Sequence, residues 1–133
     1  MRRAYTSALI VTIGVLLFGG CGPSEMSRSS MRNQEAMARL QPGMTPKEVA
    51  ELMRGDLYDK DFYKGKNGEE VLVYKYLTHP PPPTGMRYSV LRSTIDADLT
   101  PLVFVNNALE GWGWSYLETA SIKYEFVVKY KNR

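Results

Sequence analysis

Two stretches of the chain place their apolar residues at the three- to four-residue spacing of amphipathic helices. The first, residues 31–40, puts most of its apolar side chains roughly on one side and predicts a short helix. Pro42 and Gly43 follow this stretch. These residue types end helices, because proline disfavours a helical residue before it and glycine readily takes a positive φ.

The second helical stretch, residues 45–55, carries the clearest start signal in the sequence. Thr45 is a good N-cap, Pro46 suits the first helical position, and Glu48 completes a capping box with Thr45. Apolar residues then repeat at helical spacing, and Gly55 is expected to end the helix.

Beyond Gly55 the pattern becomes alternating, which is typical of β-strands. Regular alternation predicts four strands, at residues 70–78, 99–105, 109–116 and 122–130, with a helix as the second interpretation of the last segment. In the first strand two sets of side chains face opposite ways: Val71, Val73, Lys75 and Leu77 against Leu72, Tyr74 and Tyr76.

Turn-forming residues separate these segments. Residues 64–68 are rich in Gly and Asn, and Asn106-Asn107 lies between the second and third expected strands. Residues 79–84 contain four consecutive prolines, which donate no backbone hydrogen bonds and predict a stiff loop. Such a run is more often a connector than a ligand for an aromatic groove.

The first twenty residues have the features of a secretory signal peptide. Arg2 and Arg3 precede an uncharged apolar run at residues 8–18. This run is shorter than the roughly 20 apolar residues that span a bilayer, but it fits the apolar region of a signal peptide, about 7–15 residues long.

The end of this region resembles a bacterial lipobox, with Leu-Phe-Gly-Gly immediately before Cys21. In that motif, cleavage occurs before a cysteine that carries a diacylglyceryl group, so Cys21 is the expected lipid attachment site. An ordinary signal peptide with an incidental cysteine is the alternative. Gly22 resembles the sorting signal for the outer membrane of a Gram-negative cell. We therefore expect a signal peptide at residues 1–20, a flexible tether at 21–30 and a folded domain at 31–133.

Length and charge narrow the classes of function. A chain of 133 residues allows one domain. Removal of Arg2 and Arg3 leaves 15 basic and 14 acidic residues, a net charge of +1, which argues against nucleic-acid binding. The single Cys and single His exclude an intramolecular disulfide and argue against a protein-built zinc site. We expect no cofactor and no metal.

The most unusual stretch is residues 111–116, where Trp112, Trp114 and Tyr116 alternate with small residues. If this segment is a strand, the three rings share one face. They would either fill the core, as aromatic rings do in small domains, or form an exposed strip that binds a partner or the lipid interface. The glycine-rich face is a second candidate docking side, because strand glycines often mark the close approach of another backbone.

No group of residues in the sequence has the composition of a catalytic site. His79 stands beside prolines without a neighbouring nucleophile or orienting partner. Asp96 and Asp98 lack the pattern of a calcium loop and are expected in a solvated loop. Three further acidic residues look like ordinary surface charge: Asp56, Asp59 and Asp61. The sequence therefore predicts a protein that is not an enzyme.

The order of elements resembles the BamE-like (SmpA/OmlA) outer-membrane lipoproteins. The resemblance rests on Gly43-Met44-Thr45 followed by Val49, on Tyr74-Lys75-Tyr76, and on Leu102-Val103-Phe104 with Leu109 after it. It covers roughly residues 31–110; Arg54-Gly55-Asp56, the proline run and residues 112–133 depart from the family pattern.

The resemblance implies two helices packed on a three-stranded antiparallel sheet. With the further expected strand, the predicted fold is α+β, with two N-terminal helices packed on a three- to four-stranded antiparallel sheet. The resemblance also implies an accessory role beside the machinery that inserts β-barrels into the outer membrane, or a sister role with another partner.

The sequence therefore predicts a binding or scaffold module that is attached to the membrane through its N-terminal acyl chains and docks on an envelope protein complex. The alternative is an inhibitor-like or stress-response lipoprotein that binds a periplasmic enzyme. A small hydrolase or ligand carrier would need a concave pocket with convergent polar groups, which the sequence does not reveal.

Overall fold

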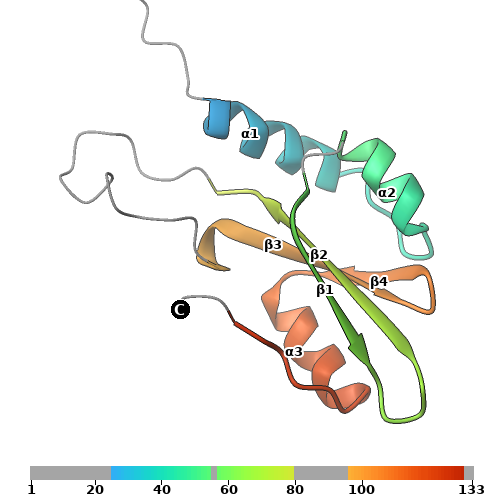
Figure 1. Ribbon diagram of the computed structural model, residues 1–133. Coiled ribbons are helices and arrows are strands. Elements are labelled where there is room, and N and C mark those ends of the chain that lie inside the picture. Colours follow the sequence, from blue (N-terminus) through green and yellow to red (C-terminus); the bar gives the residue numbers. More distant parts are fainter. Residues whose placement is uncertain (1–24, 55–56, 80–95, 131–133) are drawn as a thin grey trace, which may run out of the picture.

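Four antiparallel strands follow one another as a simple meander, in the spatial order β1-β2-β3-β4 (Figure 1). The structure is a computed structural model that describes residues 25–54, 57–79 and 96–130. Their strands are β1 (Leu57–Lys64), β2 (Glu70–Leu77), β3 (Leu99–Val105) and β4 (Ala108–Trp112). Together with α1 (Glu25–Met37), α2 (Pro46–Leu52) and α3 (Trp114–Lys123), they confirm an α+β fold.

The two central strands lie where the alternating pattern predicted them. β3 has the expected bounds, and β2 ends one residue before the expected end at Thr78. Between β3 and β4, Asn106 and Asn107 form the expected turn, with φ values of 48° and 69°. Asparagine tolerates this left-handed region better than most residues, and such turns match the twist of a hairpin.

The start of α2 also matches the sequence prediction. The Glu48 amide donates to Thr45 Oγ1 at 3.3 Å, and the Thr45 amide donates to Glu48 Oε2 at 2.8 Å, so the capping box is complete. The helix ends at Leu52, and Arg54 has a positive φ of 53°. Gly55, which we expected to end the helix, lies outside the described residues.

α1 begins earlier than the periodicity of residues 31–40 suggested. It runs from Glu25 to Met37, so residues within the range assigned to a flexible tether are helical. Ser30 and Asn33 are fully buried, and Asn33 Nδ2 donates to the carbonyl of Leu77 at 2.8 Å. This helix therefore docks on the end of β2 through a buried polar contact as well as through apolar packing.

The alternation of β2 and β3 produces a separate core on each face of the sheet. On one face, α1 and α2 cover a cluster that includes Val49, Tyr76 and Phe104. On the other face, α3 covers Val71 and Val103, among others, with Leu117 and Ala120. Figure 1 shows the resulting three layers, with α1 and α2 above the sheet and α3 below it.

The expected strand at residues 109–116 is wrong beyond Trp112. Gly113 has a φ of 96°, which turns the chain out of the sheet, and α3 begins at the next residue. A Cβ on Gly111 would lie 2.6 Å from the ring of Tyr116, so α3 returns close against the strand that precedes it. The glycines thus mark a strand-to-helix corner and not a continuous strand.

The expected fourth strand at residues 122–130 is also wrong, and the helical interpretation holds only as far as Lys123. Glu125 has a φ of 53°, and the chain then continues without ladder pairing as far as Tyr130. This C-terminal segment, residues 124–130, packs under β1, where Phe126 stacks on Tyr63 with ring centroids 4.8 Å apart. Its alternation reflects one side that packs on the domain and one that faces solvent.

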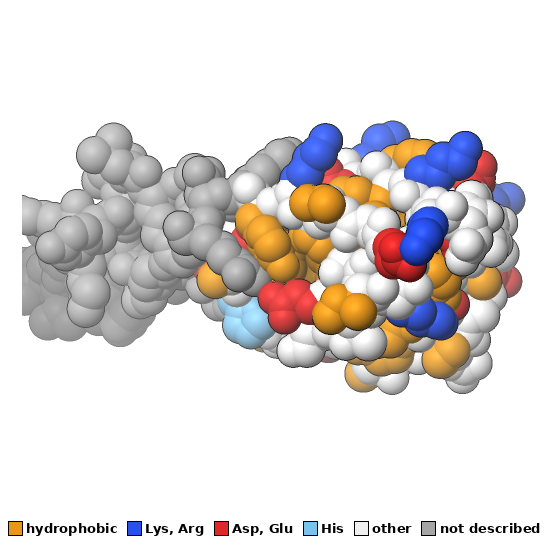
Figure 2. Space-filling model, turned by 90° about the horizontal axis from the view of Figure 1, so that it is seen from below, with side chains coloured by type: hydrophobic (Ala, Val, Ile, Leu, Met, Phe, Trp, Pro, Cys, Tyr) orange, Lys and Arg blue, Asp and Glu red, His pale blue; other side chains and the backbone are white. Residues whose placement is uncertain are grey.

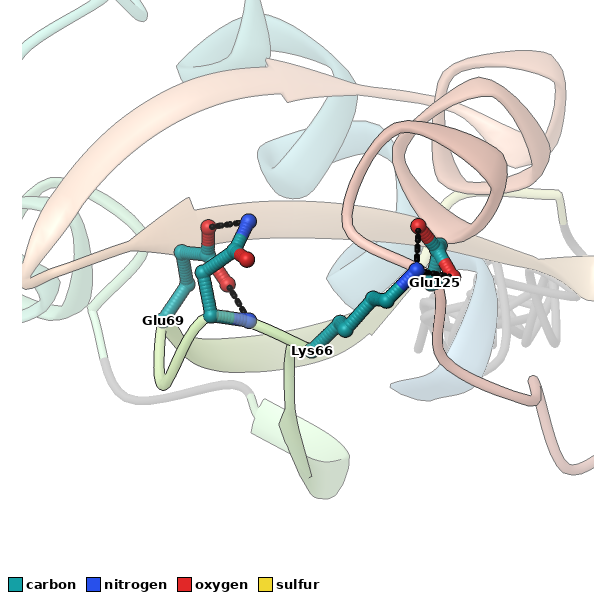
Figure 3. Close-up of polar contacts among 4 residues, drawn as sticks. Lys66, Glu69 and Glu125 are labelled. Carbon is teal, nitrogen blue, oxygen red and sulfur yellow. Dashed lines mark hydrogen bonds and ion pairs between the residues drawn. The ribbon is translucent and has the colours of Figure 1, made fainter.

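Backbone and side-chain contacts hold the start of the C-terminal segment to the β1–β2 turn. The Lys66 amide donates to the carbonyl of Tyr124 at 3.0 Å, and Lys66 Nζ lies 2.8 Å from each carboxylate oxygen of Glu125 (Figure 3). Glu69 organises the same turn by accepting a hydrogen bond from the Asn67 amide at 3.1 Å. The exposed ion pair adds little stability by itself, so the packing of Phe126 is the main anchor.

The capping box gives a direct test of α2. Thr45→Ala removes the side-chain acceptor of the Glu48 amide and should lower the free energy of unfolding by about 1 kcal/mol, measured by urea denaturation. Thr45→Ser keeps the acceptor and is the matched control. Equal stability of the alanine and serine variants would show that the capping box contributes nothing.

Candidate functional site

The residues expected to bind lipid or a partner do not form a single site in the described part of the chain. Cys21 lies outside the described residues. Trp112 stands at the end of β4 and is 38% exposed. Trp114 is the first residue of α3 and is half-buried, and its indole donates to the carbonyls of Asp96 at 3.0 Å and Leu99 at 2.9 Å. Trp114 therefore joins α3 to β3.

Tyr116 likewise ties α3 to β4. Its hydroxyl donates to Glu110 Oε2 at 3.1 Å, and the hydroxyl of Tyr124 donates to Glu110 Oε1 at 2.6 Å. Burial, followed by these bonds to Glu110, raises the pKa of both tyrosines, so both remain neutral donors. The three rings do not share a strand face, and Trp112 is the member of the set with the most exposed side chain.

A buried lysine forms the most unusual polar cluster of the described residues. Lys75 of β2 is fully buried, and its Nζ lies 2.6 Å from Asp61 Oδ2 and 3.7 Å from Asp59 Oδ2. The ammonium also lies 5.8 Å from the ring centroid of Trp114. We expected Asp59 and Asp61 to be surface charge, but they lie on the inner side of β1 and pair with this lysine; Asp56 lies outside the described residues.

Strand register explains how Lys75 meets its partners. Asp59 lies opposite Lys75 in the β1–β2 ladder and Asp61 lies opposite Val73, so both carboxylates share the face of the lysine. Burial acts to lower the pKa of Lys75, but the hydrogen bond and charge of Asp61 and the charges of Asp59 and Asp96 outweigh it, and the net pKa is raised.

A lysine held in its protonated form has no free electron pair, so this cluster is not arranged for nucleophilic chemistry. Its geometry instead fixes the register of β1 on β2, because a shift by one residue would move both carboxylates to the opposite face. We did not single out Lys75 from the sequence, although a lone charge among Val71, Val73 and Leu77 was a visible signal.

Asp96 and Asp98 are not solvated, contrary to expectation. They lie in a short 3-10 turn, η1 (Asp96–Asp98), and are 5% and 6% exposed. The carbonyl of Asp98 accepts the amides of Thr78 at 3.0 Å and His79 at 3.1 Å, which fastens η1 to the end of β2. The His79 side chain is exposed, and within the described residues no group of three or more acidic, His or Cys side chains is placed to hold a metal ion.

The two outer strands of the sheet differ in how their free edges are covered. At β4, the amide of Gly43 donates to the carbonyl of Leu109 at 2.7 Å, and the amide of Leu109 donates to the carbonyl of Met44 at 2.7 Å. The connection between α1 and α2 therefore covers the β4 edge. At β1 no strand of the described chain pairs with the outer edge.

β1 also carries exposed aromatic side chains, namely Tyr58 at 50% and Phe62 at 61%. Phe62 lies between the exposed Lys60 and Lys64 on the face of the sheet that α1 and α2 cover elsewhere, and Tyr58 lies beside α1 where the register of β1 shifts between Leu57 and Asp59. We noted alternation after residue 55 but did not predict this strand, because four of its eight residues are charged. The edge of β1 with these side chains, residues 57–64, is called the open edge below.

Among the described residues, the α3 face of the molecule has no comparable cluster of exposed aromatic side chains along a free strand edge. Figure 2 shows hydrophobic side chains scattered among Lys, Arg, Asp and Glu on this side. Ile122 and Val127 are 78% and 83% exposed, but isolated exposed apolar residues are common on monomeric proteins. The open edge and Trp112 are thus the stronger candidates for a binding surface.

Comparison with family models, with curated proteins and with solved structures gives no match for this chain.

The lysine cluster predicts a large effect of one substitution. Lys75→Met keeps the length of the side chain but leaves Asp59 and Asp61 without their buried partner. Breaking a fully buried ion pair costs about 3–5 kcal/mol. Because Asp59 and Asp61 are partly exposed, we expect the free energy of unfolding to fall by about 2–3 kcal/mol. Lys60→Met is the exposed control and should change stability by less than about 0.5 kcal/mol. Similar losses in the two variants would contradict the assigned role.

The raised pKa values predict a loss of stability at alkaline pH. Burial raises the pKa of Tyr63 above its ordinary 10.0, and the carboxylates raise that of Lys75 above 10.5. The unfolded chain therefore releases these protons first as the pH rises. Stability should be fully present below pH ~10 and decline above it, measured by urea denaturation from pH 8 to about 11.5. Lys75→Met should show a shallower decline, and an equally steep one would exclude Lys75 as a contributor.

Proposed function

We propose that this protein is a lipid-anchored binding or scaffold module on the periplasmic face of the outer membrane. The observation that carries the proposal is the lipobox-like sequence that ends at Cys21, directly before a folded domain whose first helix begins at Glu25. An acyl anchor at that cysteine would hold the domain within a few residues of the membrane surface.

The energetics of acylation support a stable anchor. Each buried CH₂ group contributes about 0.8 kcal/mol, so two or three chains on one cysteine hold a small domain far more firmly than one chain. No helix among residues 25–54, 57–79 and 96–130 combines the length and apolar character that a membrane span requires. Under this proposal, attachment is through the acyl chains.

The fold details are consistent with a BamE-like domain, which is the finer part of the proposal. α1 and α2 would be its two N-terminal helices. Gly43 takes a φ of 92° at the corner between them, Met44 packs on the core, and Thr45 caps α2, which gives the Gly-Met-Thr motif a structural role. α3 and the C-terminal segment lie on the opposite face of the sheet, outside the range of the resemblance. We therefore favour a sister family with its own envelope partner, with the β-barrel assembly machinery as one candidate.

A binding role also agrees with the surface. In the described part of the chain, no strand pairs with the outer side of the open edge, which lies beside exposed aromatic rings, and such edges recognise extended segments of other proteins. We place binding, and not catalysis, at the centre of the function for this reason.

The anchor is tested with Cys21→Ser. We expect the variant to fold as the wild type does but to appear in the soluble periplasmic fraction, whereas the wild type pellets with membranes after a high-salt wash. Ser24→Cys combined with Cys21→Ser is the matched control, because it returns a thiol outside the lipobox position. Retention of Cys21→Ser on membranes would overturn the anchor.

The kind of partner is tested by purification of the lipidated protein in mild detergent. Co-purification of a stable envelope complex is expected for a scaffold. A soluble periplasmic enzyme in its place would support the inhibitor-like alternative.

A further inference from the structure

We propose that the open edge of β1 is a docking site for an extended segment of a partner protein in which acidic and apolar residues alternate along one face. This inference rests on the proposed function as a binding module and names the surface and the chemistry of the partner. It does not depend on the lipid anchor.

The backbone of β1 has hydrogen-bonding groups that point away from the sheet. The amide of Gly65 donates to the carbonyl of Glu69 at 2.8 Å, at the end of the ladder in which Lys64 lies opposite Glu70. Bonded and non-bonded pairs alternate in an antiparallel ladder. The backbone hydrogen bonds to β2 are therefore made by Asp59, Asp61 and Tyr63. The backbone N–H and C=O groups of Lys60, Phe62 and Lys64 point outward.

No group within the described residues bonds to these outward amides. The contrast with β4 is informative, because there the Gly43–Met44 backbone makes two 2.7 Å hydrogen bonds to Leu109 on the edge strand. Proteins normally cover, shorten or charge a free edge, since an open one templates pairing with another chain. Lys60 and Lys64 charge the edge of β1 and so select against indiscriminate pairing, but no described strand covers it. The register of β1 shifts between Leu57 and Asp59, and the strand then pairs regularly from Asp59 to Lys64, which is long enough for an added strand.

The side chains of the open edge define what would pair with it. On the face shared with α1 and α2, the exposed Phe62 lies between Lys60 and Lys64, and the exposed Tyr58 lies at the register shift beside α1. On the other face, Asp59 and Asp61 are already paired with Lys75. Among the described residues, the charge along this edge that has no ion-pair partner is positive, and a strand with acidic residues opposite the lysines and apolar residues opposite the rings complements it.

An apolar groove lies at the start of the open edge, between α1 and β1. Its walls include Met26 of α1 and Leu57, Tyr58 and Leu77 of the sheet. An apolar residue of the partner placed beside Tyr58 would lie against this shallow groove. The groove therefore sets one end of the docked segment.

A second copy of this chain is a poor occupant. A symmetric pair of edge strands must run antiparallel, so each strand meets itself. If the twofold axis of the dimer passes through Lys60, the two Lys60 side chains lie opposite each other. If it passes through Asp61, the two Asp61 side chains lie opposite each other. Like charges directly opposite are destabilising, so the charge pattern disfavours self-pairing and favours an acidic partner strand.

The test uses the purified full chain in mild detergent and a synthetic peptide, Thr-Val-Thr-Glu-Thr-Val-Thr-Glu-Thr, acetylated and amidated at its ends. Binding is followed by fluorescence anisotropy of the labelled peptide and by amide chemical shifts of the protein. We expect saturable binding, with the largest amide shifts at Lys60, Phe62 and Lys64.

Lys60→Pro and Lys60→Ala form the matched pair of variants. Both remove the charge, but only proline removes the outward amide, and it leaves the bonds to β2 in place. We expect Lys60→Pro to weaken binding at least about tenfold, and Lys60→Ala to weaken it only about two- to fivefold, the range for an exposed ion pair. Thermal unfolding of both variants verifies that the domain is intact.

Several outcomes would overturn the docking site. They are the absence of peptide binding, binding of equal strength to both Lys60 variants, amide shifts away from β1, and equal binding of a peptide with Lys in place of Glu. Dimerisation through β1, detected by sedimentation, would replace the partner strand with a second copy.

Failure of this inference is distinguishable from failure of the proposed function. A chain that binds the peptide at β1 but whose Cys21→Ser variant stays on membranes loses the anchor and keeps the docking site. A chain that is anchored through Cys21 but does not bind the peptide keeps the anchor and loses the docking site.

Discussion

The two-sided burial of β2 and β3 is the constraint on which the rest of the structure depends. Both strands alternate apolar residues on both faces, so neither face of the sheet can be left to water. α1 and α2 cover one face, and α3 with the C-terminal segment covers the other. The corner at Gly113 follows from this requirement, because the chain must leave the end of β4 and return beneath the sheet within a few residues. A strand continued to Tyr116 would have left Val71 and Val103 exposed.

Lys75 is the one charged residue of β2 on the face that α3 covers, and it links the core to the edge. Its ammonium needs carboxylates within the low-dielectric layer, and β1 supplies them in the form of Asp59 and Asp61. A strand with four charged residues is thereby held on the sheet with little apolar burial of its own, since Tyr63 is its one buried residue. The same arrangement turns Asp59, Asp61 and Tyr63 of β1 inward and leaves its lysines, Tyr58 and Phe62 on the outside.

The sequence predicted those parts of the fold that depend on local signals. The capping box at Thr45, the alternating faces of β2 and the Asn106-Asn107 turn each depend on a few neighbouring residues, and each was correct. The errors arose where a long-range contact decided the outcome. Asp59 is structurally an ion-pair partner only because the register places it opposite Lys75. Residues 124–130 alternate like a strand, but Phe126 packs on Tyr63 and no ladder forms. The shared strand face expected for Trp112, Trp114 and Tyr116 failed for a local reason, because one positive φ at Gly113 separates the first ring from the other two.

The asymmetry between the two sheet edges connects the fold to the proposed role. The Gly43–Met44 backbone closes the edge of β4 and at the same time sets the entry to α2, so this edge is not available without unfolding the helical layer. A partner can reach the edge of β1 without unfolding of the helical layer, because the ion pair of Lys75 with Asp61 holds this strand on the sheet from its inner face. Strand addition alone gives modest affinity. A domain held at a membrane surface, however, meets partners on that surface at a high effective concentration. Once the domain is attached to the membrane, its binding to such a partner resembles an intramolecular step. A weak but specific edge is therefore sufficient for an anchored module, whereas a freely diffusing protein would need a larger interface to achieve the same occupancy.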